Sequence, residues 1–278
     1  MILGIGDLLP SPLESVKHES YDPNWFSALF AIEDQHFWFR ARNQVIATLV
    51  SQITAGLTLG YQVLEVGCGT GNVLRVLERV CSSGTVIGMD LYAEGLQFAR
   101  QRSSCLLVQG DVHEPPCGAR FDLIGLFDVL EHLPDDLHVL RDLRRLLVPG
   151  GRLLLTVPSH PSLWSYFDEV SCHCRRYQLA ELKSKMIQTG FQIEYITEYM
   201  FSIFPLVWLG RRLMAFTNRR PVVVPGSHHK LAASELHITP IINDLLTWLL
   251  MQETRLIARR YALPIGTSLV AVARKDSG

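Results

Sequence analysis

Residues 61–71 read YQVLEVGCGTG. The first six have the largely apolar character of a buried strand, and the next five place glycines at positions 67, 69 and 71. Glycines permit a tight turn and let a ligand lie directly against the backbone. An amphipathic segment, 72–81, follows, and the first turn of a helix offers N–H groups to a ligand. The stretch therefore predicts a strand, a ligand-binding turn and a helix in succession.

The same alternation of apolar runs and amphipathic segments continues beyond this stretch. Further apolar runs lie at 85–90, 105–109, 121–127, 152–157, 191–196 and 267–273. Segments with helical spacing lie between them, at 93–102, 136–147 and 178–189. Continuously apolar strands that alternate with helices are typical of a parallel sheet covered on both faces. We predict an α/β fold with a doubly wound, Rossmann-like sheet.

Composition narrows the class of protein. The chain has 278 residues, 26 Lys and Arg, 27 Asp and Glu, and a net charge of −1; 48% of its residues are hydrophobic. This composition excludes intrinsic disorder, and the charge argues against a nucleic-acid partner. Six cysteines in a chain of this length do not indicate a disulfide framework. The amino terminus lacks a basic start, and the longest apolar run, 199–210, is too short to span a bilayer. We expect a cytoplasmic protein, with membrane association left open.

Three carboxylates accompany the first three strands. Glu65 lies just before the glycines, Asp90 ends the second strand, and Asp111 follows the third. A carboxylate at the end of the second strand can accept hydrogen bonds from both hydroxyls of a ribose. The glycine spacing is GxGxG, whereas dinucleotide-binding dehydrogenases need GxGxxG for close packing of the helix. The pattern therefore disfavours a nicotinamide dinucleotide.

In this combination the chain resembles the class I S-adenosylmethionine-dependent methyltransferases of the small-molecule type (methyltransferase type 11/12-like), over about residues 60–200 and the last strand. The resemblance implies a seven-stranded, mostly parallel sheet whose last strand is antiparallel. It also implies S-adenosylmethionine as the cofactor and S-adenosylhomocysteine as the product. The implied cofactor contacts are Glu65, Gly67, Cys68, Gly69 and Gly71 at the methionine end, Asp90 at the ribose, Leu91, Asp111 and Val112 at the adenine, and Phe127 and Asp128 beside the sulfonium.

Candidate catalytic residues follow the fourth and fifth strands, where ligands bind in such sheets. Methyl transfer is an in-line displacement, so the protein mainly positions the acceptor and excludes water. A base is needed only where the acceptor must lose a proton. His173 is the first candidate because histidine titrates near neutrality, and His132 and Asp168 are the others. A structural role for His132 and a pair between Asp168 and Arg175 or Arg176 are the alternatives.

Two segments rich in aromatic and polar residues, 36–40 (HFWFR) and the loop 158–177, are predicted to line the acceptor. The candidate substrate-binding residues are His36, Trp38, Arg40, Trp164, Phe167, Arg175, Arg176 and Tyr177. For the first segment, an amphipathic helix packed on the sheet is an equal alternative. Cys172-His173-Cys174 lacks a second ligand pair at zinc spacing, so we predict no metal site.

The chain is predicted to have four parts: a helical cap (1–55), the cofactor-binding core (56–200), a helical insertion (201–266), and the last strand with its tail (267–278). The insertion contains eight Lys or Arg and three Asp or Glu, and one helix is signalled by Thr239 as N-cap and Pro240 as its first residue. An apolar and basic insertion favours a small, apolar acceptor that resembles a lipid, prenyl compound or quinone. A lid, a homodimer interface and peripheral membrane contact are its alternative roles. A non-catalytic binding or assembly protein with this fold is the alternative function.

Overall fold

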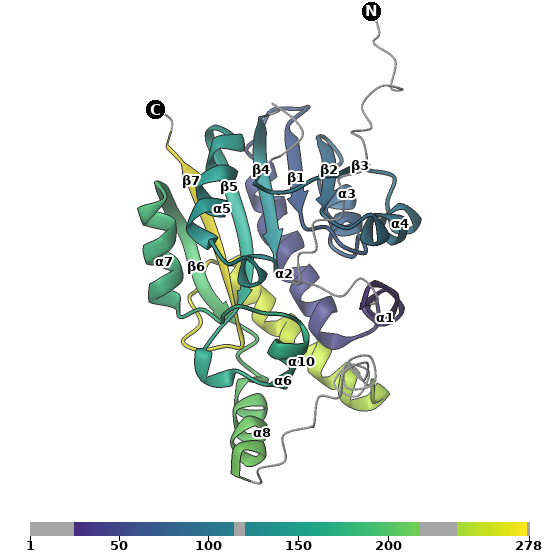
Figure 1. The fold of residues 1–278 in the computed structure, drawn as a ribbon, viewed down its shortest axis with the longest axis vertical. Helices are drawn as coiled ribbons and strands as arrows, with labels where there is room; N and C mark the ends of the chain where they lie inside the picture. Colours follow the sequence, from purple (N-terminus) through teal and green to yellow (C-terminus); the bar gives the residue numbers. More distant parts are fainter. Residues whose placement is uncertain (1–24, 114–119, 217–237, 277–278) are drawn as a thin grey trace, which may run out of the picture.

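The computed structural model describes residues 25–113, 120–216 and 238–276, and it contains a central seven-stranded sheet (Figure 1). The strands are β1 (Gln62–Val66), β2 (Thr85–Asp90), β3 (Leu106–Gln109), β4 (Phe121–Phe127), β5 (Leu147–Pro158), β6 (Phe191–Tyr199) and β7 (Ser268–Lys275). Their order is β3-β2-β1-β4-β5-β7-β6. β1 to β5 pair in parallel, whereas β7 runs antiparallel between β5 and β6. The predicted fold, including its antiparallel last strand, is confirmed.

Helices flank both faces of the sheet and gather at one of its edges (Figure 1). They are α1 (Trp25–Ile32), α2 (Phe37–Thr54), α3 (Leu74–Val80), α4 (Ala93–Arg102), α5 (Asp136–Leu146), α6 (Tyr166–Val170), α7 (Leu179–Gln188), α8 (Phe204–Phe216) and α10 (Pro240–Ala258). Two 3₁₀ turns lie at Leu130–His132 and Pro161–Leu163. Thr239 is the N-cap residue of α10, as predicted, although its side chain makes no capping hydrogen bond. Among the described residues, no helix is both long enough and apolar enough to cross a membrane.

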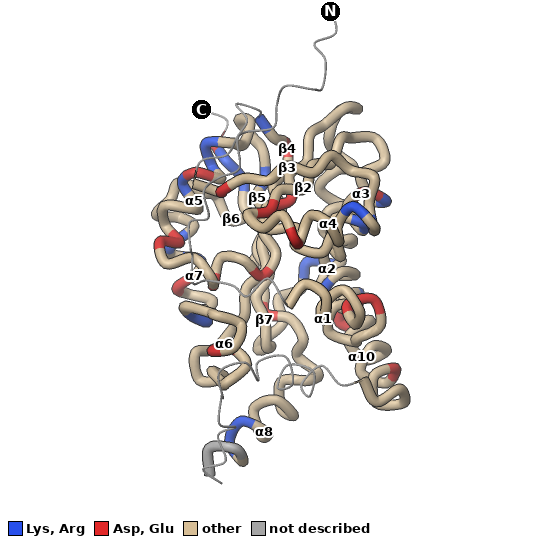
Figure 2. Tube along the Cα trace, turned by 45° about the vertical axis from the view of Figure 1, so that its right-hand side comes forward, with Lys and Arg blue, Asp and Glu red and all other residues tan. Residues whose placement is uncertain are grey.

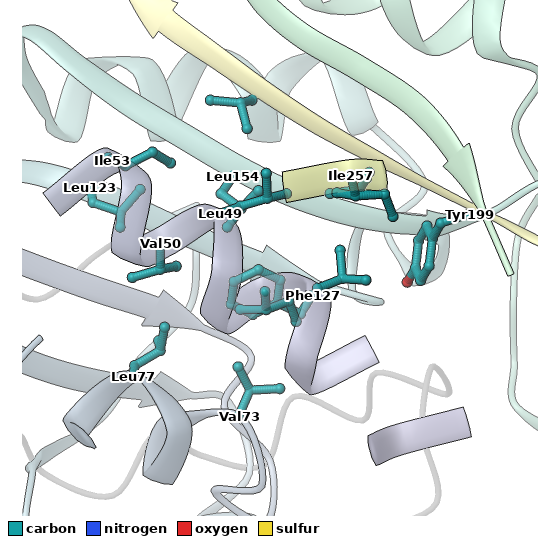
Figure 3. Packing of buried hydrophobic residues seen from close by; sticks show 14 of the residues in the cluster. Leu49, Val50, Ile53, Val73, Leu77, Leu123, Phe127, Leu154, Tyr199 and Ile257 are labelled. Atoms are coloured by element: carbon teal, nitrogen blue, oxygen red, sulfur yellow. The ribbon is translucent and has the colours of Figure 1, made fainter. Parts of the chain in front are cut away.

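α2 is the main cover of one face of the sheet. Its residues Leu49, Val50 and Ile53 point toward Leu123 of β4 and Leu154 of β5 (Figure 3). α3 and α10 complete this layer, and α5 and α7 cover the opposite face. Burying an aliphatic side chain of this size contributes about 1.5–3 kcal/mol. The apolar stripe of α2 therefore fixes the helix, with the HFWFR segment at its start, against the sheet.

The carboxyl ends of the parallel strands carry the glycine loop and the predicted acids. α1 contacts α4, and α2 packs against both α3 and α10. α8 extends away from the sheet at the bottom of Figure 1. The first 24 residues and residues 217–237, which include three of the basic residues of the insertion, lie outside the described residues.

Candidate functional site

The glycine loop between β1 and α3 has a backbone that only glycine accommodates at two positions. Gly67 and Gly71 have φ angles of 73° and 76°. A Cβ on Gly67 would lie 2.4 Å from a methyl group of Val129, and one on Gly71 would lie 2.8 Å from the Ala99 Cα. Both glycines are therefore required by the fold of the loop as well as by any ligand that approaches it.

Asp90, at the end of β2, holds this loop in place. One carboxylate oxygen accepts a hydrogen bond from the Gly69 N–H (2.7 Å), and the other accepts one from the Tyr92 N–H (2.9 Å). Burial raises the pKa of Asp90 to about 6, although these backbone donors oppose the shift. Each carboxylate oxygen has two lone pairs, so the group retains capacity for two further donors such as ribose hydroxyls.

Glu65 is a buried acid beside the loop, with only 2% of its surface exposed. Its Oε2 has no hydrogen-bond partner. Burial raises the pKa of Glu65 well above its ordinary value; Arg42 opposes the shift, and Asp90 and Glu33 add to it. A buried carboxylate oxygen without a donor is costly, and a cationic amino group would satisfy it.

Arg42 is a residue of this site that the sequence interpretation missed. Its Nη1 donates to the Asp128 carboxylate (2.9 Å), and its guanidinium lies 5.0 Å from the Trp38 ring centroid. Asp128 adopts a φ of 55° at the end of β4. Arg42 follows Phe39 by three residues on the buried face of α2, and this spacing is the signal that could have identified it. The predicted Arg40 instead lies on the exposed side of α2, 3.8 Å from Asp244 of α10.

A second acid, Glu33, ties the turn between α1 and α2 to the glycine loop. Its Oε2 accepts hydrogen bonds from the Thr70 hydroxyl and from Arg102, both at 2.5 Å. Arg102 also donates to the Phe30 carbonyl and stacks on its ring. The amino-terminal helices are therefore bound to the loop by buried, charge-assisted hydrogen bonds.

The remaining predicted cofactor residues lie at the same edge of the sheet. Leu91 follows β2, and its carbonyl accepts a hydrogen bond from the Gln109 side chain. Asp111 and the buried Val112 follow β3, and Phe127 is the buried last residue of β4. The fold therefore brings the ends of β1, β2, β3 and β4 to one edge.

The predicted catalytic residues form a buried cluster after β4 and β5. His173 Nδ1 lies 2.9 Å from Asp168 Oδ1, and its Nε2 lies 4.0 Å from Glu131. The His132 and His173 ring centroids are 4.7 Å apart. Two segments separated by about forty residues thus meet at one point, and Glu131, the neighbour of His132 after β4, belongs to the same cluster.

The cluster has a defined charge distribution. Burial acts to raise the pKa of Asp168, but hydrogen bonds from His173 and Arg176 outweigh it and lower the pKa to about 2. Burial raises the pKa of Glu131 well above its usual value, and Asp128 adds to the shift. Burial, with a contribution from His173, lowers the pKa of His132 to about 3. Asp168 is therefore the anion of the cluster and His132 a neutral imidazole.

Several predicted substrate-binding residues are engaged in structural contacts. Arg176 pairs with Asp168 (2.7 Å), as the alternative interpretation held. Arg175 pairs with Asp136 (2.8 Å), which also accepts a hydrogen bond from the buried Tyr177 hydroxyl (2.8 Å). These residues fix the loop against the start of α5.

The aromatic candidates are divided between two environments. His36 is the N-cap of α2, where its ring accepts a hydrogen bond from the Trp38 N–H, and burial lowers its pKa to about 4. Phe167 packs edge-on against Trp25, whereas Trp164 is exposed.

Two clusters have the spacing of metal ligands. Glu131, His132 and His173 place one ligand atom each within 4.8 Å of one another, and so do His113, His138 and Asp142. The five cysteines within the described residues are not joined in disulfides. The cluster around His173 contains a carboxylate in place of the Cys-His-Cys set considered in the sequence.

Comparison with known proteins identifies the family. Residues 34–196, more than half of the chain, match the family model described as a methyltransferase domain. The chain belongs to this methyltransferase family. Its predicted membership of the class I S-adenosylmethionine-dependent methyltransferases is confirmed.

The names of two curated relatives refer to quinones. The chain is 39% identical over 111 residues to 2-phytyl-1,4-naphtoquinone methyltransferase of Thermosynechococcus vestitus, covering 38% of this chain. It is 28% identical over 159 residues to ubiquinone biosynthesis O-methyltransferase of Klebsiella pneumoniae, covering 54% of this chain. The chain spans 49% of the first relative and 63% of the second, less than two thirds of either.

Solved structures share the fold at lower sequence identity. One is the [4+2]-cyclase SpnF, with a TM-score of 0.53 and 18% identity over 84% of this chain and 82% of that chain. A likeness at this level concerns the fold, since one fold hosts many chemistries.

Proposed function

We propose that the protein transfers the methyl group of S-adenosylmethionine to a small, apolar, quinone- or lipid-like acceptor. The observation that carries the cofactor assignment is the buried Oε2 of Glu65, which has no hydrogen-bond partner beside the glycine loop. The cationic amino group of the methionine moiety supplies the donor that this oxygen lacks. Arg42, whose Nη1 lies 2.9 Å from Asp128, is positively charged. Its guanidinium would bind the carboxylate of the methionine moiety.

The remaining cofactor contacts follow from the same edge of the sheet. Asp90 would accept the ribose hydroxyls, and Asp111 and Val112 would bracket the adenine beside Leu91. Gly67, Gly69 and Gly71 would let the methionine moiety approach the backbone, with Cys68 between them. Phe127 and Asp128 would flank the sulfonium. The cofactor supplies an activated methyl group with its leaving group already attached.

The chain's own residues then position the acceptor and manage its proton. His173 is the general base of this proposal, oriented by Asp168 in the manner of a carboxylate–histidine pair. His132 and Glu131 lie beside the imidazole, and its Nε2, 4.0 Å from Glu131, is the nitrogen that would take the proton. Such a base contributes about 10²–10⁴ in rate when the acceptor is a hydroxyl or an acidic carbon.

Two observations support an apolar acceptor: the names of the relatives, and the aromatic side chains that are predicted to line its site. Two relatives whose names refer to quinones are 39% and 28% identical to parts of this chain. The cap (1–55) and the insertion (201–266) would enclose the acceptor with Trp38, Trp164 and Phe167. Aromatic walls suit a quinone ring better than a polar metabolite.

We further propose that α8 contacts the surface of an anionic membrane, where such acceptors reside. Leu206, Trp208 and Leu209 are exposed on this helix, and Arg212 stacks 5.3 Å from the Trp208 ring. α8 contains two arginines and no acid, so it appears in Figure 2 with blue and no red. Exposed apolar side chains beside arginine and tryptophan are typical of helices that lie in the interface of a bilayer.

Flotation with lipid vesicles tests this contact. The protein should float with vesicles of phosphatidylcholine and phosphatidylglycerol, and Leu209→Glu should abolish flotation. Arg211→Gln and Arg212→Gln should each weaken binding about fivefold, as expected for one arginine near an anionic surface. The matched control is Ile187→Glu, which places the same charge at an exposed apolar position of α7. Equal flotation of all variants would exclude α8 as the contact.

Labelled methyl transfer tests the function itself. We expect purified protein to bind S-adenosylhomocysteine by calorimetry and to transfer a labelled methyl group from S-adenosylmethionine to a component of a cell extract. Recovery of the label in the organic phase supports the apolar acceptor. Label confined to the aqueous or macromolecular fraction would refute the apolar acceptor, but the protein would still be a methyltransferase. Absence of S-adenosylhomocysteine binding by folded protein would instead favour the non-catalytic alternative.

A further inference from the structure

A second histidine–carboxylate cluster lies between α5 and the segment that follows β3. His138 and Asp142 are four residues apart on α5 and therefore share one face of the helix. His113 approaches them from the segment after β3. His113 Nδ1 lies 3.6 Å from Asp142 Oδ2, and His138 Nε2 lies 3.0 Å from the same oxygen. Three ligand atoms from two parts of the chain thus converge on one point.

Asp142 is the buried member of this cluster. Only 7% of its side chain is exposed, whereas the two imidazoles lie at the surface. Its Oδ1 accepts a hydrogen bond from Arg145 (2.7 Å), but its buried Oδ2 has no hydrogen-bond partner despite the two nearby imidazole nitrogens. A buried carboxylate oxygen normally has a partner, so this oxygen, which faces both rings, indicates a missing ligand.

The distances fit a metal ion placed among the three atoms. Zinc binds imidazole nitrogen at about 2.0–2.1 Å and carboxylate oxygen at about 2.0–2.2 Å in a tetrahedron, which places neighbouring ligand atoms about 3.3 Å apart. The two separations, 3.0 and 3.6 Å, lie on either side of this value. The two rings are nearly perpendicular, at 85°, with centroids 5.2 Å apart, so their edges can face one ion without stacking.

We propose that His113, His138 and Asp142 form a binding site for a divalent transition metal of the zinc class, with the fourth position open to solvent. Imidazole ligands favour zinc, nickel or copper over magnesium and calcium, which prefer all-oxygen sites. The sequence interpretation predicted no metal site because it considered only the cysteines around His173. It missed this cluster because His113 lies far from His138 and Asp142 in the chain.

A metal at this site would link α5 to the segment that follows β3. The His113 N–H donates to the Asp111 side chain (2.9 Å), so a metal on His113 would also fix the backbone that follows β3. That backbone is adjacent to Val112, at the adenine position of the proposed cofactor site. Metal binding itself does not depend on the proposed methyl transfer, so it can be tested without any substrate.

Metal titration of the tag-free, chelator-treated full chain tests the site. We expect one equivalent of Zn²⁺ to bind by calorimetry, and Co²⁺ to give the visible absorption of a tetrahedral site. His138→Ala and Asp142→Asn should each weaken binding by at least about 100-fold, since loss of an outer-shell partner alone reduces metal affinity about 10- to 100-fold. Arg145→Gln should strengthen binding a few-fold because it removes a cation that contacts Asp142.

Two results would overturn the proposal. One is a wild-type protein that takes up neither ion; the other is uptake that survives both His138→Ala and Asp142→Asn. His138 is exposed, so the metal-free Tm of its variant should match that of the wild type and thereby confirm that lost binding reflects a lost ligand. Glu131→Gln, in the cluster around His173, then shows whether any residual uptake belongs there.

Discussion

Asp90→Asn is expected to weaken binding of S-adenosylhomocysteine by about 10- to 100-fold, corresponding to the loss of charge-assisted hydrogen bonds worth about 1.5–3 kcal/mol. The carboxylate is the proposed hydrogen-bond acceptor for the ribose hydroxyls, and it also accepts a hydrogen bond from the Gly69 N–H (2.7 Å). The two backbone N–H groups donate to different oxygens of Asp90, and an asparagine amide has only one oxygen that can accept. Isothermal calorimetry at neutral pH measures the change.

A matched variant separates cofactor binding from folding. Asp122, near the start of β4, accepts a hydrogen bond from the Gln62 N–H (2.8 Å). Asp122→Asn therefore also weakens a hydrogen bond from a backbone N–H to a carboxylate, but at the opposite end of the strands. Both variants should lower Tm, whereas only Asp90→Asn should lower affinity. Equal affinity of the two variants would refute the assignment of Asp90 to the ribose.

The pKa of Asp90 adds a pH dependence with a defined sign. Burial raises this pKa from 3.8 to about 6, so the folded protein binds a proton that the unfolded chain releases. The contribution of Asp90 to the free energy of unfolding is therefore complete below about pH 4 and is lost as the pH rises through about 6. Cofactor affinity should change in the opposite direction, because only the ionised carboxylate accepts two hydroxyls. Affinity should fall below pH 6 in the wild type, and this step should be absent in Asp90→Asn.

The sheet was predictable because most of its strands contain a short, largely apolar run between amphipathic segments. The position of α8 was not predictable. Nearly every residue from Phe201 to Leu209 is apolar, so the sequence has no helical periodicity that would indicate a buried face. The structure indeed leaves several of these side chains exposed. Amphipathic helices such as α5 and α7, in contrast, were located to within a few residues.

The site was predictable where the backbone itself is the functional group. Glycines and strand-terminal acids occupy fixed positions relative to a strand, so Gly67, Asp90 and Asp111 could be placed from the sequence alone. Side chains from other elements could not, because their direction depends on tertiary packing. Arg40 and Arg42 are only two positions apart in the sequence, yet Arg40 faces solvent and Arg42 contacts Asp128. The meeting of Glu131 with His173 likewise depends on how the loop after β5 folds back.

His173→Ala is expected to lower kcat by about 10²-fold or more, the lower range for loss of a positioned general base. Binding of S-adenosylhomocysteine should stay within a few-fold of wild type, because the imidazole contacts Asp168 and Glu131 and none of the proposed cofactor ligands. The measurement is transfer of labelled methyl to the acceptor that the labelling experiment identifies.

Two further variants distinguish catalysis from folding. Asp168→Asn should lower kcat more than it raises KM, because Asp168 is a positioning residue that orients His173 and does not touch the acceptor. His160→Ala removes a comparable pair, in which His160 Nε2 lies 2.7 Å from Glu198, and should affect Tm without a comparable loss of kcat. Unchanged turnover in His173→Ala would mean that the cluster is a scaffold and that the acceptor loses its proton without help from the protein. That outcome would favour an acceptor already ionised or bearing a free lone pair, for which in-line positioning alone is sufficient.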